Sequence, residues 1–317
     1  MGSEGIRLIT YFSDGHRGAG TPVGDALIDL YDRHEVATSI LLRGTTVVAV
    51  DTRPKIEAVL DQTLRLTHPL LVTTEDTQLL TGDIEPVRLS ENPGQATRLT
   101  VYFGRQDRVY QVPAFEAVCE LLYRRGIAGA TILPGVDGTT DGRRHRNRFL
   151  HRDADVPLTA VAVGSGHQIG MVLPEVGALF RHPFMTIEKV CVCKRDGHLI
   201  GRPEIAPGPD GHGTAARLKL TIYTSEGARH DGHPVHREIV RQLRSAGITD
   251  AASLRGIWGF HGDHAPHGEH FPRLGRHIPV VTTAICRPEL VSVAFDIVDA
   301  LITQRGLVTA ETVRAVS

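Results

Sequence analysis

The feature that most constrains the fold is an internal repeat, in which three separate stretches of the chain share one pattern. The stretches are "RLITYF" (7–12), "RLTVYF" (98–103) and "RLKLTIY" (217–223), and each is rich in β-branched and aromatic residues, as strands are. When they are aligned on their tyrosines, an arginine and then a proline follow at equal distances in each copy: Arg17 and Pro22, Arg108 and Pro113, Arg229 and Pro234. Proline suits the first turn of a helix, so each copy is predicted to continue from a strand into a helix.

The remainder of each copy follows the same order. The first helices of copies two and three are expected to end at Gly126 and Gly247, whereas copy one has Glu35 there. A second strand then ends at a glycine that lies at one distance from the proline in all three copies: Gly44, Gly135 and Gly256. A third strand, a second helix and a last strand follow, and the last strands align three glutamates: Glu75, Glu188 and Glu311. Copies two and three carry a long loop after the glycine, and copy one does not.

This order predicts an α+β fold of three tandem ferredoxin-like (βαββαβ) units. The predicted units are residues 1–82, 97–195 and 216–317, and residues 83–96 and 196–215 are linkers. A ferredoxin-like sheet leaves one face bare, so we expect three sheets to pack face to face as an intramolecular pseudo-trimer in a monomeric chain.

Composition excludes several classes of protein. The formal charge is −1 over 317 residues and only 5% of residues are aromatic, which argues against a nucleic-acid-binding protein. No apolar run approaches the length that spans a bilayer, and the N-terminal residues do not form a secretory signal. Four cysteines are too few for a disulfide scaffold, which favours buried thiols and a cytoplasmic location.

The repeated motifs resemble those of the domain-of-unknown-function 190 family, a branch of the PII-like signalling proteins. The resemblance rests on the tyrosine-ended strand, the following arginine and proline, and "ATILPG" or "AASLRG" at the second strand. It extends to His145 and His267, which precede Pro157 and Pro279 by equal distances, and to the terminal T-x-E-x-V pattern. The resemblance implies three PII-like units fused in one chain, the first without its long loop. It implies a regulatory protein that binds an adenine nucleotide or a related anion in clefts between copies. It also implies long loops that contact a partner, with a membrane transporter as the suggested partner.

The best single ligand site predicted from sequence is the turn "VGSGHQIG" of copy two. Its members are Gly164, Ser165, Gly166, His167 and Gly170. Glycines let backbone N–H groups approach a phosphate, and a helix N-terminus adds favourable partial charge. A surface turn without a ligand is the alternative interpretation. The repeated Arg17, Arg108 and Arg229 have two interpretations as well, because they can hold an anionic ligand or form salt bridges with the aligned glutamates.

The long loop of copy three suggests a second function. His261, His264, His267 and His270 recur at regular spacing, and imidazoles with nearby carboxylates suit Zn²⁺ or Ni²⁺. A divalent-metal-binding protein is therefore the alternative hypothesis. The sequence contains no G-x-S-x-G, H-E-x-x-H, P-loop or C-x-x-C motif, so we expect a protein that is not an enzyme.

Overall fold

The computed structural model describes the chain except residues 1, 14, 19, 44, 69, 90, 141–142, 147–155, 206–213, 262–265, 269–277 and 317. Residues 1–82, 95–199 and 214–317, which enclose the predicted units and the strands that extend them, are called the first, second and third segments below. The first segment contains β1 (Ser3–Tyr11), β2 (Arg17–Gly18), β3 (Thr21–Pro22), α1 (Val23–Arg33), β4 (Thr38–Leu42), β5 (Thr46–Thr52), α2 (Arg53–Thr67) and β6 (Leu71–Thr81).

The second and third segments repeat this order with additional short strands. The second contains β7 (Gln95–Gly104), β8 (Arg108–Val109), β9 (Val112–Pro113), α3 (Ala114–Arg124), β10 (Gly129–Thr140), β11 (Arg143–Arg146), β12 (Pro157–Gly164), α4 (Gly166–Gly177), β13 (Phe184–Arg195) and β14 (His198–Leu199). The third contains β15 (Thr214–Ser225), β16 (Arg229–His230), β17 (His233–Pro234), α5 (Val235–Ser245), β18 (Ala251–Arg255), β19 (Trp258–His261), β20 (His267–Gly268), β21 (Pro279–Cys286), the 3₁₀ helix η1 (Pro288–Leu290), α6 (Val291–Leu301) and β22 (Leu307–Val316).

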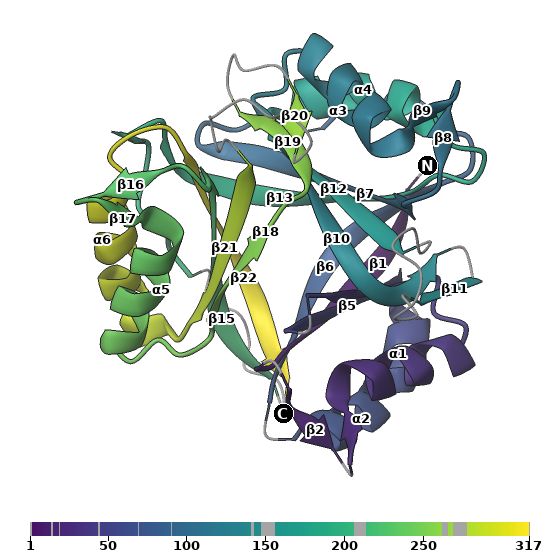
Figure 1. The fold of residues 1–317 in the computed structure, drawn as a ribbon, viewed down its shortest axis with the longest axis horizontal. Helices are drawn as coiled ribbons and strands as arrows, with labels where there is room; N and C mark the ends of the chain where they lie inside the picture. The colour runs from purple at the N-terminus through teal and green to yellow at the C-terminus, as the bar shows by residue number, and fades with distance from the viewer. Residues whose placement is uncertain are drawn as a thin grey trace.

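The major strands of all three segments form one antiparallel sheet. It contains 16 strands in the described part of the chain, with the main order β14-β13-β7-β12-β10-β4-β5-β1-β6-β22-β15-β21-β18. The sheet closes on itself because β13 pairs with β7 along one edge and with β6 and β22 along the other. The helices lie outside this sheet as the pairs α1/α2, α3/α4 and α5/α6 (Figure 1).

The predicted fold of three ferredoxin-like units in a pseudo-trimer is therefore wrong, although the order of elements along the chain is the expected one. A ferredoxin-like unit has its own four-stranded sheet, whereas these strands continue across the segment boundaries in one hydrogen-bonded sheet. The physical reason is that a strand edge carries unpaired N–H and C=O groups that a neighbouring strand can satisfy. Here β10 continues past Gly135 and pairs with β4 of the first segment, so no separate sheet edge remains between them.

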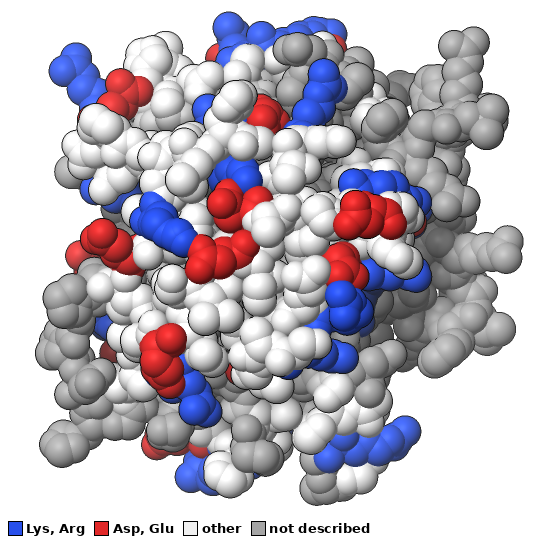
Figure 2. Space-filling view, turned by 90° about the vertical axis from the view of Figure 1, so that its left-hand side faces the viewer, with Lys and Arg blue, Asp and Glu red and all other residues white. Residues whose placement is uncertain are grey.

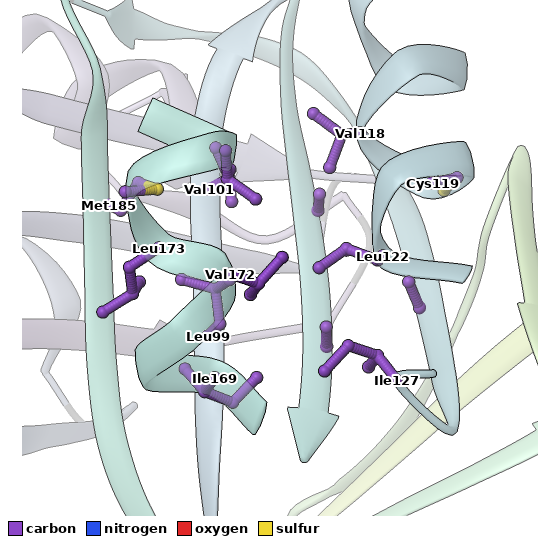
Figure 3. Close-up of a cluster of buried hydrophobic side chains, with 14 of the residues drawn as sticks. Leu99, Val101, Val118, Cys119, Leu122, Ile127, Ile169, Val172, Leu173 and Met185 are labelled. Atoms are coloured by element: carbon purple, nitrogen blue, oxygen red, sulfur yellow. The ribbon is translucent and has the colours of Figure 1, made fainter. Parts of the chain in front are cut away.

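Apolar side chains fill both faces of the sheet. On the outer face each helix pair covers a cluster formed mainly by its own segment. Figure 3 shows the second cluster, where α3 and α4 pack on strands of the sheet. Among its buried members are Leu99, Val101, Val118, Leu122, Ile169, Val172 and Leu173. The inner face forms another cluster, to which all three segments contribute, for example through Ile9, Leu133 and Val281. Within the described residues, no helix is long and apolar enough to cross a membrane.

Candidate functional site: the junctions between segments

Six buried ionic side chains lie on the inner face of the sheet. Arg7, Arg98 and Lys219 occupy one column of the repeat, and the aligned glutamates occupy another. The sheet register places the members opposite one another as three equivalent cross-strand pairs: Arg7 with Glu75, Arg98 with Glu188, and Lys219 with Glu311. We call these six residues the central charge cluster.

The contacts in the central charge cluster run between segments as well as within them. Lys219 Nζ lies 2.6 Å from Glu75 Oε1, and Arg7 Nη1 lies 3.5 Å from Glu188 Oε1. Arg98 contacts all three carboxylates: its Nη2 is 3.3 Å from Glu75, its Nε is 3.2 Å from Glu188, and its Nη1 pairs with Glu311. The cluster thus joins the three segments through their charged groups.

The nearby cations lower the pKa of two carboxyls in this cluster, Glu311 and Glu188. Burial opposes ionisation of Glu311, but Arg98 and Lys219 more than offset it and lower the pKa of its carboxyl to about 2. The pKa of Glu188 is lowered in the same way, since Arg98 and Arg7 outweigh the effect of burial. Three cations and three carboxylates balance, so the cluster carries no net charge that would attract a ligand. We assign it a structural role.

The junctions between segments differ in how their strands meet. Where the first and second segments meet, residues 135–140 of β10 pair with β4. Where the second and third meet, β19 pairs with the first part of β10. Where the third and first meet, no strand within the described ranges pairs with the outer edge of β18, which ends the strand order. This third boundary is called the open junction.

A cleft of about 800 Å³ lies at the open junction. One wall consists of α5 and the start of β18, and the other consists of first-segment residues at the ends of β1 and β6. Its lining includes Tyr11, Phe12, Leu71, His236, Arg237, Val240, Arg244, Asp250 and Ser253. This volume is in the range of small-molecule sites, and the lining combines aromatic, hydroxyl and basic groups.

The basic groups of this cleft come from one face of α5. Arg237, Val240 and Arg244 follow the spacing that places residues on a single stripe of a helix. Neither arginine has an ion-pair partner within the described residues, and both side chains are exposed. Burial and the neighbouring Arg237 lower the pKa of His236, whose Nδ1 is buried without a hydrogen-bond partner among the described atoms. Asp250 is the carboxylate in the lining, so basic groups predominate.

Two other clefts lie at or near the remaining junctions and suit an anion less well. One of about 540 Å³ is lined by the three carboxylates of Glu4, Asp76 and Glu188 and by two basic residues, Lys189 and Arg53. Asp76 holds Arg53 at 2.8 Å. The other, of about 60 Å³, lies between the second and third segments and is lined largely by apolar groups. In Figure 2 the face that carries α5 and α6 shows acidic and basic residues intermingled, so the cationic groups of the open-junction cleft do not belong to a broad basic surface.

The turn predicted as the best single ligand site lies at the N-terminus of α4, and the chain itself occupies its hydrogen-bonding groups. Ser165 is the N-cap: its hydroxyl accepts from the Gln168 N–H, and the Gln168 side chain accepts from the Ser165 N–H. The His167 N–H donates to Glu91 at 3.0 Å. The chain itself therefore provides hydrogen-bond partners for Ser165, His167 and Gln168. Ligand binding at this turn stays a prediction.

The glycines of this turn allow close packing of the 83–96 linker and of neighbouring side chains. A Cβ atom at Gly170 would lie 2.1 Å from the Val87 carbonyl oxygen of that linker. At Gly164, a Cβ atom would lie 3.1 Å from a methyl carbon of Ile127. Gly166 begins the helix.

The three repeated arginines are exposed and lie in short hairpins, whose strands have two residues each, before the first helix of each segment. In each hairpin the arginine is the register partner of the repeated proline: Arg17 with Pro22, Arg108 with Pro113, and Arg229 with Pro234. Arg17 donates to the Gly20 carbonyl at 3.0 Å, and Arg229 donates to the Glu226 carbonyl at 2.7 Å. They do not form salt bridges with the aligned glutamates, which pair inside the sheet. A ligand role for these arginines stays a prediction.

The two aligned loop histidines occupy equivalent positions. His145 of β11 pairs in register with Gly138, and His267 of β20 pairs with Gly259. Of the proposed metal ligands, His264 and His270 lie outside the described residues. His261 Nε2 is 3.2 Å from Asp196 Oδ1, but the described residues contain no group of three or more His, Cys, Asp or Glu side chains that would hold a metal ion. The metal-binding alternative therefore has no support in this part of the chain.

Sequence reasoning missed Arg237, Arg244 and His236. The two arginines share a stripe of α5 with Val240, so a helical wheel would have placed them together on one exposed face. The wheel would not have shown that the first segment lies opposite that face, because this depends on how the sheet closes.

Comparison with known proteins identifies the family to which this chain belongs. The fold and clefts described above define a protein with three βαββαβ segments around one closed sheet and a basic cleft at one junction. The model of the DUF190 family, described as Uncharacterized ACR, matches residues 96–192 and 217–315. These ranges comprise more than half of the chain and lie within the second and third segments. The chain belongs to this family.

One solved structure with similarity to this chain is the crystal structure of aspartate kinase from Synechocystis. The similarity covers 98% of this chain and 44% of the kinase chain, with 8% sequence identity and a TM-score of 0.27. This chain thus spans less than half the length of that protein. A likeness this weak carries no argument about fold or function.

Proposed function

We propose that the chain is a PII-like regulatory protein that binds a small anionic effector at the open junction. The observation that carries the proposal is the pair Arg237 and Arg244, two cations without described partners that line a cleft of about 800 Å³. Two guanidinium groups suit the phosphates of a nucleotide, and Tyr11 and Phe12 in the same lining offer an apolar surface for a base. We take an adenine nucleotide as the effector.

The remaining parts of this proposal come from the family resemblance. The first segment is interpreted as a third, shortened copy of the DUF190 domain, whose missing loop leaves one junction open. The protein is proposed to act in the cytoplasm without catalysing a reaction and to transmit effector binding to a partner protein. A membrane transporter is the partner that the resemblance suggests. The effector would change the partner's affinity only to the extent that it binds one conformation of the chain better than another.

Isothermal titration calorimetry of the whole chain with ATP, ADP and AMP tests the site. We expect binding to the wild type, and a loss of about tenfold or more in affinity in the double variant Arg237→Glu/Arg244→Glu, because the charges facing the phosphates are reversed. Arg124→Glu, which reverses an exposed charge on α3 paired with Glu120, is the matched control and should bind as the wild type does. Because the protein is proposed not to catalyse a reaction, the release of inorganic phosphate from ATP with the protein should equal the release in buffer alone.

The variant Gly166→Asp separates the two candidate positions. It places a carboxylate at the N-terminus of α4, far along the chain from the open junction. If Gly166→Asp abolishes nucleotide binding while the double arginine variant binds normally, the effector site is the α4 turn and the proposed placement is wrong. If none of the three nucleotides binds the wild type, the effector proposal itself is contradicted.

A further inference from the structure

The outer edge of β18 presents unpaired backbone groups to the cleft at the open junction. Asp250 O accepts from Ile285 N, and Gly256 N donates to Pro279 O, so even-numbered residues of β18 are hydrogen-bonded to β21. The N–H and C=O groups of the odd-numbered residues Ala251 and Ser253 therefore point away from β21, toward the cleft that both residues line. No described strand pairs with them.

The two corresponding edges elsewhere in the sheet are covered by strands of this chain. The β4 edge is covered by residues 135–140, and the β10 edge is covered by β19. Both covering strands carry a glycine that approaches the covered strand closely: a Cβ atom at Gly138 would lie 2.1 Å from Ser39 O, and one at Gly259 would lie 2.3 Å from Ala130 O. In two of the three segments, a strand of the next segment thus covers the edge that corresponds to the outer edge of β18.

In the first segment, the connection equivalent to those that hold the covering strands consists of residues 43–45 alone. β4 ends at Leu42 and β5 begins at Thr46, whereas the equivalent connections in the other segments hold the covering strands. Burial reflects this difference: every residue of β4 is buried, but the residues of β18 after Ala251 are only half-buried. The open-junction cleft lies beside β18 where the covering strand would be.

We infer that β18 binds an extended acidic segment of a partner protein, which adds to the sheet as the missing strand. Side chains of an added strand alternate between the two faces of the sheet. On the helix side they would meet Arg237 and Arg244 of α5, and on the inner side they would meet Tyr11 and Leu71. The complementary segment alternates acidic and apolar residues. Five or six residues suffice, since β18 contains five.

The acidic segment is the part of the partner protein whose binding the effector regulates. Only this point rests on the proposed function. Nucleotide phosphates and the acidic segment would use the same two arginines, so the effector is expected to displace the segment. The strand addition itself requires no nucleotide, and it is tested without one. A failure of the peptide experiment therefore leaves the calorimetric result with nucleotides unaffected.

The test uses a fluorescein-labelled heptapeptide that alternates valine and glutamate, and binding to the whole chain is followed by fluorescence anisotropy. Two matched peptides serve as controls: one is N-methylated at alternate backbone amides, and one has lysine in place of glutamate. We expect saturable binding of the first peptide and about tenfold or greater weakening for each control, because one loses strand pairing and the other loses charge complementarity. Equal affinity of the N-methylated peptide, or no binding of the first peptide, would overturn the inference.

Two further measurements place the peptide on β18. Ser253→Pro removes one edge N–H, so it should weaken peptide binding, whereas Ser253→Ala keeps that N–H and should bind the peptide as the wild type does. In hydrogen-exchange experiments the peptide should slow the amides of Ala251 and Ser253 without changing those of β4. If these two amides already exchange slowly in the free protein, another part of this chain or a second copy covers the edge, and the inference is wrong.

Discussion

The central charge cluster gives the sharpest stability prediction. Arg98→Met keeps most of the side-chain volume and removes the guanidinium that contacts Glu75, Glu188 and Glu311. The wild-type cluster balances three cations with three carboxylates, so the variant contains one uncompensated buried carboxylate. Breaking a buried ion pair by removing one partner costs about 3–5 kcal/mol. We expect the free energy of unfolding to fall by that amount.

Urea unfolding followed by circular dichroism at pH 8 measures this loss. Arg124→Met is the matched control, since it removes an exposed arginine paired with Glu120, and such pairs contribute about 0–1 kcal/mol. The double variant Arg98→Met/Glu311→Gln should recover part of the stability because it restores the charge balance. If Arg98→Met costs no more than Arg124→Met, the cluster does not stabilise the junctions and the argument is refuted.

The pH dependence of the stability of the wild type and of Arg98→Met follows from the same charged groups. Glu311 has a folded-state pKa of about 2, below the unfolded value of about 4.3. Its stabilising contribution in the wild type is therefore complete above about pH 4.3 and is lost as the pH falls toward 2. Arg98→Met removes the largest contribution that lowers the pKa of Glu188 and Glu311 while burial remains, so we expect the pKa of one of these carboxyls to rise above its unfolded value. The penalty of the variant should therefore be smaller at pH 5 than at pH 8.

Two other predictions concern packing and thiol accessibility. Gly170→Ala should destabilise the protein by about 1–3 kcal/mol, because its Cβ would lie 2.1 Å from Val87 O, while Gly201→Ala, with no atom within 4 Å of the new Cβ, should change the unfolding midpoint little. In the native protein at pH 8, iodoacetamide should modify the exposed Cys191 and spare the buried thiols, whose pKa values are raised by burial: Cys119, Cys193 and Cys286. Mass spectrometry of the intact protein checks the second prediction, and two or more added groups would contradict it.

Much of the local structure could be predicted from the repeat. Pro22, Pro113 and Pro234 precede the first helix of each segment as expected. Gly126 and Gly247 follow their helices with φ of 72° and 83°. In the first segment the same conformation is taken by Glu35, with φ of 51°, so the backbone requirement persists where glycine does not. Patterns of this kind depend on neighbours in sequence, which is why they were accessible.

The way the segments join could not be predicted in the same way. Pairing of β10 with β4 depends on contacts between residues far apart in sequence, and an alternating pattern does not specify which edge meets which. The sequence aligns Arg7, Arg98 and Lys219 in one column before the tyrosines. Because one member is lysine, this column does not stand out as a repeated arginine, whereas the column after the tyrosines does. The repeat therefore suggests Arg17, Arg108 and Arg229 as possible partners of the glutamates, and the sheet register shows this alternative to be wrong. The repeat also shows that the first segment has a shortened loop, whereas the effect of this loop on β18 depends on how the sheet closes.

The central claim is that a small anion binds at the open junction, and a crystal structure of the chain with ADP tests it most directly. The account predicts nucleotide density between α5 and the first segment, with its phosphates contacting Arg237 and Arg244. Density at the α4 turn, or an empty cleft in crystals grown at a nucleotide concentration that saturates the calorimetric signal, would contradict it.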